Sequence, residues 1–513
     1  MKKLYCLSGL ALPFCACQNI QAASAVQQTE QPNIIFIITD QQRGDALGCS
    51  GNDRIITPNL DALAQDGYYF SNAYSATPSS TPARAGLLTG MSPWHHGMLG
   101  YGNVAEHYQY ELPQMLSDCG YLTLGIGKMH WKPQNALHGF DATILDESGR
   151  VESPYFMSDY RKWFQTVAPG KNPDETGIGW NDHTAGEYKL PENLHPTVWT
   201  ADVAVRTIQH YEGGKPLFLK ISFARPHSPY DPPKRVLDKY VHIEMEAPAK
   251  GEWSQEIGAN VTDPKTKPDA AFGQFGDDYV KNTKKHYYAA VTFIDEQIGR
   301  IVAALKEKGM YDNTIICFTS DHGDMMGDHN HWRKTYAYEG SSAIPYIVKF
   351  PKSMKVVKPV GSTIENPVEL RDFLPTFVDL AGGVVPADMD GKSLATLVSE
   401  EHPEWRRWID LEHATCYSDH NYWCALTDGK IKYIWFVHTG EEQLFDLVKD
   451  PKETTDVSKE RKYKKQLAEL RAAMVAHLSE RGEEWVKDGQ LVTREKTLLY
   501  SPNYSKVQTP NKK

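Results

Sequence analysis

The sequence predicts an α/β fold with a large, mostly parallel sheet flanked by helices, and a smaller C-terminal antiparallel sheet-plus-helix subdomain. Two patterns support this prediction. Four apolar runs that suit buried strands alternate with helical segments over roughly residues 33 to 350. After about residue 400, short strand-like runs around a tight turn replace them. Because 513 residues exceed one compact core, we expect a leader over 1–25, a large domain over 26–400 and a subdomain over 401–513.

The predicted strands of the large sheet are continuous apolar runs, the pattern of strands buried on both faces. They are Asn33–Asp40, Tyr121–Ile126, Pro216–Phe223 and Thr314–Asp321. Helices are predicted from Thr57 and over Ala289–Lys308. Residues 140–200 and 230–285 have few periodic signals, as in insertions that shape a substrate pocket. The C-terminal subdomain is predicted to contain strands over Tyr422–Thr427, Lys432–Phe436 and Gln443–Leu447, and a helix over Lys464–Glu480.

The N-terminal segment has the pattern of a secretory leader. Lys2–Lys3 forms a basic start, Leu4–Phe14 an apolar centre, and Ala23–Ala25 a small-residue cleavage site. We therefore expect secretion across the inner membrane and a periplasmic location. A lipoprotein anchor at Cys15 or Cys17 is a weaker alternative, and no later segment is long enough to span a bilayer.

Charge and cysteine usage exclude some function classes. A net charge of −10 argues against a nucleic-acid partner. Five of the 8 cysteines lie beyond the leader. This number is odd and the cysteines show no zinc-type spacing, so a disulfide framework is not indicated. Cys416 and Cys424 could pair, and the sequence leaves this open.

The stretch Ser79–Gly90 is expected to place a nucleophile-type residue, Ser80, at a helix start. Thr81 suits the N-cap, Pro82 the first helical position, and Gly90 the far end. The free N–H groups and the positive dipole end of such a helix attract anions. Arg84, one turn into the helix, could add a forked contact to an oxyanion.

Polar residues follow the predicted strands at the pole where ligands bind in such sheets. They are Asp40, Lys128, His130, His227 and Asp321. The pairs Asp40–Gln41 and Asp321–His322 offer oxygen ligands that suit a divalent cation such as calcium or magnesium. A histidine ligand would instead favour a softer metal.

Several motifs resemble those of the formylglycine-dependent (type I) sulfatases of the alkaline-phosphatase superfamily. Ser80–Arg84 with Leu88–Gly90 resembles the signature in which a Cys or Ser is oxidised to formylglycine. Further matches are Gly127–His130, Phe223–His227, Ser320–Asp324, Gly327–His329 and Lys334. The resemblance implies an alkaline-phosphatase-like fold. It implies catalytic roles for Ser80, Arg84, Lys128, His130, His227 and Lys334. It also implies one calcium ion held by Asp40, Gln41, Ser80, Asp321 and His322, although Gln41 and His322 stand where Asp and Asn are usual.

The resemblance implies that the protein removes O-sulfate groups from sulfated carbohydrates, using a formylglycine made from Ser80. The Ser form is the type converted by an anaerobic sulfatase-maturing enzyme, which becomes an expected partner. We expect host glycosaminoglycan, mucin-type or algal glycans, with a lean to galactose, N-acetylgalactosamine or glycosaminoglycan sugars. Candidate substrate-binding residues are His95, His96, Trp180, Asp182, His183, Arg225, Glu412 and His413.

Two alternatives remain at this point. A phosphate mono- or diester hydrolase of the same superfamily would use an unmodified Ser80 and zinc, which His322 would suit, whereas Pro82 and Arg84 favour the sulfatase. A non-catalytic protein that binds sulfated glycans would leave Ser80 unoxidised and show no turnover.

Overall fold

An eight-stranded sheet runs through the computed structural model, which describes residues 31–151 and 153–504. Its strand order is β5-β4-β6-β1-β7-β8-β2-β9. The first five strands are mutually parallel: β5 (Ala142–Leu145), β4 (Leu122–Gly127), β6 (Leu217–Pro226), β1 (Asn33–Asp40) and β7 (Thr314–Ser320). Strand β8 (Tyr346–Lys349) is antiparallel to β7 and to β2 (Tyr68–Phe70), and β2 pairs in parallel with β9 (Thr363–Ile364). The predicted α/β class with a mostly parallel sheet is confirmed.

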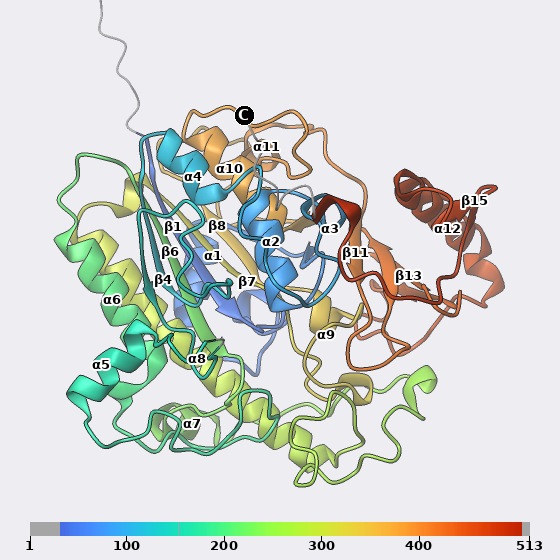
Figure 1. The fold of residues 1–513 in the computed structure, drawn as a ribbon, viewed down its shortest axis with the longest axis horizontal. Helices are drawn as coiled ribbons and strands as arrows, with labels where there is room; N and C mark the ends of the chain where they lie inside the picture. Colours follow the sequence, from blue (N-terminus) through green and yellow to red (C-terminus); the bar gives the residue numbers. More distant parts are fainter. Residues whose placement is uncertain (1–30, 152, 505–513) are drawn as a thin grey trace, which may run out of the picture. The chain divides into compact units, whose positions relative to one another are not determined.

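Helices cover both faces of this sheet, on opposite sides of the strands in Figure 1. Side chains alternate along β1, so Ile35 and Ile37 face one layer while Ile34 and Phe36 face the other. The first layer holds α1 (Pro58–Gln65), α6 (Pro196–His210) and α8 (Asp277–Glu307). The second holds α2 (Ser80–Thr89), α4 (Leu112–Asp118) and α10 (Phe373–Leu380). The central strands are thus buried on both faces, as their continuous apolar sequences require.

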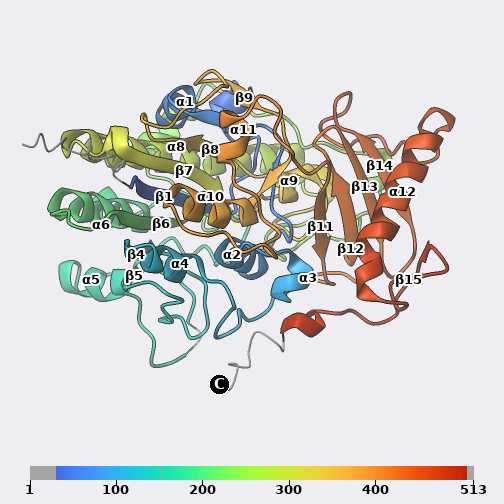
Figure 2. The same ribbon diagram turned by 90° about the horizontal axis from the view of Figure 1, so that it is seen from above.

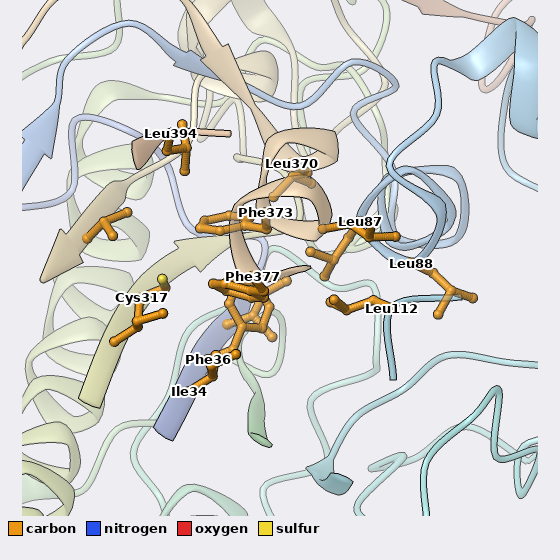
Figure 3. Packing of buried hydrophobic residues seen from close by; sticks show 14 of the residues in the cluster. Ile34, Phe36, Leu87, Leu88, Leu112, Cys317, Leu370, Phe373, Phe377 and Leu394 are labelled. Atoms are coloured by element: carbon orange, nitrogen blue, oxygen red, sulfur yellow. The ribbon is translucent and has the colours of Figure 1, made fainter. Parts of the chain in front are cut away.

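The second layer fixes the position of helix α2. Leu87 and Leu88 pack into the cluster around Phe36, whose ring lies 4.8 Å from that of Phe373 and 5.8 Å from that of Phe377 (Figure 3). Burying one leucine is worth about 1.5–3 kcal/mol. The start of α2 is therefore held against the carboxyl ends of the strands by apolar packing behind it.

A four-stranded antiparallel sheet forms the C-terminal part. It consists of β11 (Ile409–His413), β12 (Trp423–Thr427), β13 (Ile431–Phe436) and β14 (Glu442–Asp446). Helix α12 (Lys464–Leu478) runs alongside it in Figure 2 and packs on it through Leu470, Met474 and Leu478. From Gln31 onward the chain forms one compact unit. The boundary at residue 400 stays a prediction.

The remaining elements are short. Strand β3 (Ala73–Tyr74) pairs with β10 (Val368–Glu369), and β15 (Val486–Lys487) pairs with β16 (Gln490–Leu491). The other α-helices are α3 (Pro93–His96), α5 (Asp159–Val167), α7 (Lys234–Leu237), α9 (Glu339–Ser342) and α11 (Ala395–Ser399). Turns of 3-10 helix are η1 (Gly48–Ser50), η2 (Glu192–Leu194), η3 (Asp238–Tyr240), η4 (Glu252–Ser254), η5 (Tyr311–Asn313), η6 (Asp328–Asn330), η7 (Leu370–Asp372), η8 (Arg461–Tyr463) and η9 (Ser479–Arg481).

Some expectations need correction. Helix α8 begins at Asp277 rather than Ala289, because its first turns carry polar and aromatic residues instead of an apolar stripe. The 140–200 stretch contains β5, α5 and the start of α6. Cys416 and Cys424 are free thiols. The predicted leader over 1–25, with the possible anchors Cys15 and Cys17, lies outside the described residues. Within the described part of the chain, no helix is long and apolar enough to cross a membrane.

Candidate active site

Ser80 occupies the first position of helix α2. Ser79, whose backbone is extended at φ −156°, is the N-cap, so the predicted cap at Thr81 is wrong by two positions. The helix ends as predicted, since Gly90 adopts a left-handed conformation at φ 68°. Ser80 is fully buried. Its side chain thus lies at the positive end of the helix, sheltered from solvent.

Carboxylates and a histidine converge on Ser80 from the ends of two paired strands. Asp40 ends β1 and Asp321 follows β7, which are neighbours in the sheet. Ligand atoms of Asp40, Asp321 and His322 lie within 4.8 Å of one another. Ser80 Oγ lies 3.0 Å from His322 Nε2. This arrangement brings together four of the five residues expected to hold a metal.

The donor set has the properties of a cation site. Among the described residues, Asp40 Oδ1 and Gln41 Oε1 are buried oxygens without a hydrogen-bond partner. His322 Nδ1 lies 2.8 Å from Gly323 O, which assigns the proton to Nδ1 and leaves the Nε2 lone pair facing Ser80. Burial lowers the pKa of His322 to about 4, so the imidazole is neutral, as a metal ligand must be. A divalent cation between Asp40, Asp321 and His322 would satisfy Asp40 Oδ1 and the histidine nitrogen.

Arg84 is committed to protein partners. Its guanidinium donates to Asp321 Oδ2 (3.0 Å), Asp40 Oδ2 (3.1 Å), Lys128 O (2.8 Å) and Ser222 Oγ (3.0 Å). These bonds use four of the five N–H donors of Arg84, so its expected contact with an oxyanion stays a prediction. The same bonds position the two carboxylates.

Two lysines and two histidines belong to the same buried cluster as Ser80 and Asp40. Lys334 Nζ lies 3.4 Å from Ser80 Oγ and 3.3 Å from His227 Nε2. Lys128 Nζ pairs with Asp40 Oδ2 at 2.6 Å. The ring of His130 is buried, and neither of its nitrogens has a hydrogen-bond partner in the described part of the chain. These groups provide positive charge and titratable nitrogens next to the serine.

The charges of the site act on one another. Burial alone would raise the pKa of Asp40, but the positive charges of Lys128 and Arg84 hold it well below 3.8. Burial lowers the pKa of His227 well below 6.5, and the neighbouring Lys334 lowers it further. Burial also lowers the pKa of Lys334 to about 8. Near neutral pH, Asp40 is ionised, His227 is neutral and most of Lys334 is protonated.

Comparison with known proteins identifies this arrangement. Residues 32–384 match the family model for sulfatases, and residues 327–480 match the model for the C-terminal part of N-sulphoglucosamine sulphohydrolase. The chain belongs to the sulfatase family. It is thus an enzyme that hydrolyses sulfate esters.

Individual relatives support this assignment. An arylsulfatase of Clostridium perfringens is 38% identical over 478 residues, covering 90% of this sulfatase and 97% of that protein. An N-acetylglucosamine-6-O-sulfatase of Bacteroides thetaiotaomicron is 26% identical over 525 residues, covering 90% and 88%. A solved structure of a protein in complex with its substrate D-glucosamine-2-N,6-O-disulfate aligns with a TM-score of 0.70 at 24% identity, covering 88% of this chain and 98% of that one. It shows the same fold.

Two of the expected substrate-binding residues of the sulfatase lie near Ser80. The ring of Trp180 stacks on His227 at 4.7 Å and lies 5.2 Å from Lys128 Nζ. Arg225 Cζ lies 5.9 Å from the same ring, and its Nε pairs with Asp231 at 3.2 Å. Trp180 therefore covers the basic side of the site.

Asp182 and His183 support the loop that carries Trp180. The carboxylate of Asp182 accepts from the backbone N–H of Gly179 at 2.8 Å. His183 is buried among aromatic rings, 4.6 Å from that of Trp332, and its Nδ1 lies 2.8 Å from the hydroxyl oxygen of Tyr279. Their contacts are those of a scaffold.

Four further candidates have partners within the protein. Both oxygens of Glu412 accept from Arg481, at 2.8 and 2.7 Å, and its expected role in substrate binding stays a prediction. His413 Nε2 lies 2.8 Å from the Oγ of Ser79, the residue before Ser80.

For the two neighbouring histidines of α3, substrate binding likewise stays a prediction. His95 bridges Asp390 (2.7 Å) and Glu480 (3.2 Å). His96 is buried, and burial lowers its pKa to about 3.

The sequence analysis missed two residues that shape the site. Ser222 lies inside a predicted strand, and its Oγ accepts from Arg84. Glu147 accepts from the backbone N–H groups of Met129 (2.8 Å) and His130 (2.9 Å), which fixes the turn after β4. Ser222 carried a weak signal as a polar residue in an apolar run, whereas Glu147 carried none.

Proposed function

We propose that this sulfatase removes O-sulfate groups from sulfated carbohydrates, using a formylglycine made from Ser80. The observation that carries the proposal is the position of Ser80. It is buried at a helix N-terminus, with cation ligands on one side and Lys128, His130, His227 and Lys334 on the other. When present, the aldehyde hydrate of formylglycine supplies the nucleophile that attacks sulfur.

A divalent cation fits the acidic side of this site, as the partnerless oxygens of Asp40 and Gln41 indicate. Asp321, His322 and the modified Ser80 would complete its ligands. We propose calcium, which would neutralise charge on the nonbridging sulfate oxygens. The nitrogen of His322 makes zinc or manganese the alternatives to test.

The residues of the chain itself supply the remaining chemistry. Lys128 and Lys334 attract and orient the sulfate through charge-assisted hydrogen bonds. Lys334 Nζ lies 3.3 Å from His227 Nε2 and has a pKa near 8, so this pair can hold a proton for the leaving alcohol oxygen. Neither ring nitrogen of His130 has a hydrogen-bond partner among the described residues, so His130 would be free to accept a proton when sulfate is released.

The substrate, partner and location follow from the relatives and the N-terminal sequence. A relative named N-acetylglucosamine-6-O-sulfatase supports a saccharide substrate, and we retain the lean to galactose, N-acetylgalactosamine or glycosaminoglycan sugars. An anaerobic maturing enzyme would oxidise Ser80. The leader pattern over 1–25 supports secretion to the periplasm.

A panel of sulfated mono- and disaccharides tests the proposal. The protein is co-expressed with an anaerobic maturase, stripped of metal, and assayed for sulfate release with calcium, zinc or manganese. We expect turnover with calcium and none in a Ser80→Ala control. Zinc-dependent hydrolysis of phosphate esters by unmodified protein would favour a phosphoesterase. Binding without any turnover would favour a glycan-binding protein.

A further inference from the structure

One arginine beside the active site differs from the other buried arginines of the described chain. Arg333 is 9% exposed, and no carboxylate of the described residues forms an ion pair with it. Every other buried arginine in this part of the molecule pairs with at least one carboxylate; they are Arg43, Arg84, Arg225, Arg371 and Arg481. A guanidinium stays charged at all relevant pH values. Among the described residues, its charge is thus left without a counter-ion.

The side chain of Arg333 is held in place by an aromatic ring. Its guanidinium carbon lies 4.4 Å from the ring centroid of Tyr417, and its Nε has no hydrogen-bond partner in the described residues. Stacking on an aromatic face orients the planar guanidinium while leaving its N–H groups available. Tyr417 itself is 38% exposed, so the pair lies at the border between the interior and solvent.

The backbone links Arg333 to a residue that contacts Ser80. Arg333 directly precedes Lys334, whose Nζ lies 3.4 Å from Ser80 Oγ. Its own backbone is left-handed at φ 64°, fixed by bonds from Arg333 N to Asp324 Oδ1 (2.9 Å) and from Met325 N to Arg333 O (2.7 Å). This conformation is uncommon for a residue other than glycine and has an energetic cost that surrounding contacts must offset. The backbone of Arg333 is therefore fixed directly before Lys334.

We infer that Arg333, stacked on Tyr417, is a second anion subsite that binds an additional sulfate or carboxylate group of the saccharide beside the sulfate ester facing Ser80. The inference rests on the proposed function and narrows it to saccharides with more than one negative charge. A guanidinium matches the paired oxygens of either group, and low local dielectric strengthens the contact.

Matched substrates test this subsite. They are a monosulfated saccharide, the same saccharide with a second sulfate, and the same saccharide with a carboxylate. A charge-assisted contact predicts that wild-type enzyme prefers one of the dianionic forms by about 10- to 100-fold in kcat/KM, mainly through KM. Arg333→Gln should bring this ratio close to one, Arg333→Lys should keep part of it, and Tyr417→Ala should reduce it.

Two controls separate this inference from the proposed function. Arg300→Gln removes an arginine of α8 that is 46% exposed and paired with Asp202, and it should leave the ratio unchanged. Binding of the same saccharides to Ser80→Ala protein, with and without Arg333→Gln, reports the subsite without catalysis. If Ser80→Ala protein prefers the dianionic saccharides and the mature wild-type enzyme turns over none of them, the subsite is supported and the proposed function is contradicted. Equal affinity for mono- and dianionic saccharides, or a preference that survives Arg333→Gln, overturns the inference.

Discussion

Arg84 should contribute strongly to the stability of the metal-free protein. Its guanidinium is fully buried and bonds the carboxylates of Asp40 and Asp321 at 3.1 and 3.0 Å. Removing one partner of a buried ion pair costs about 3–5 kcal/mol, because the remaining charge is left uncompensated. Arg84→Met leaves Asp321 without its arginine partner and leaves Asp40 with Lys128 alone. We therefore expect a loss of at least about 3 kcal/mol in the free energy of unfolding.

Equilibrium urea denaturation in the presence of a chelator measures this loss. Arg84→Lys keeps a positive charge but lacks the forked geometry, so it should lose less than Arg84→Met. Arg300→Met is the matched control, since exposed ion pairs contribute about 0–1 kcal/mol. Saturating calcium should restore part of the stability of Arg84→Met, because a bound cation stabilises the native state by mass action. A loss below about 1 kcal/mol for Arg84→Met would refute the positioning role.

Three other substitutions test the structure. Glu412→Gln removes the carboxylate partner of Arg481, so it should lower the free energy of unfolding by about 3–5 kcal/mol without changing KM. A raised KM at unchanged stability would instead support a substrate-binding role for Glu412. Gly127→Ala forces a φ of 88° on alanine and brings its Cβ within 2.0 Å of Ser222 O. The substitution should therefore lower Tm and kcat, and an unchanged Tm would contradict this close approach of the two strands. The hydrogen bond that His95 donates to Asp390 raises the pKa of His95 above 6.5. The contribution of this bond to stability, at most about 1 kcal/mol, is complete below pH 6.5 and is lost as pH rises through the folded pKa. The stability difference between wild type and His95→Gln should therefore shrink as the pH rises. A difference independent of pH would contradict the ion pair between His95 and Asp390.

Much of the fold was predictable because the central strands are buried on both faces. Strand β1 matches its predicted bounds, Asn33–Asp40, since a continuous apolar run has few other stable locations. Strand β11 escaped prediction because its sequence, Ile409–His413, mixes apolar with charged residues. The charges are tolerated there because partners such as Arg481 come from distant segments.

The candidate active site was likewise predictable only in part. Residues at strand ends could be grouped from the sequence, because parallel strands present their carboxyl ends at one edge of the sheet. The roles of Arg84, Glu412 and Arg333 could not be assigned, because they depend on which partner each charge meets. Those partners, or the lack of one for Arg333, follow only from tertiary packing.

The mass of the peptide that contains Ser80 tests the central claim most directly. It is measured in protein made with and without an anaerobic maturase, alongside sulfate release from sulfated saccharides by the same samples. We expect loss of two hydrogens at Ser80 only with the maturase, and sulfate release in proportion to the modified fraction. An intact serine in a sample that releases sulfate at full rate would contradict hydrolysis through a formylglycine at Ser80.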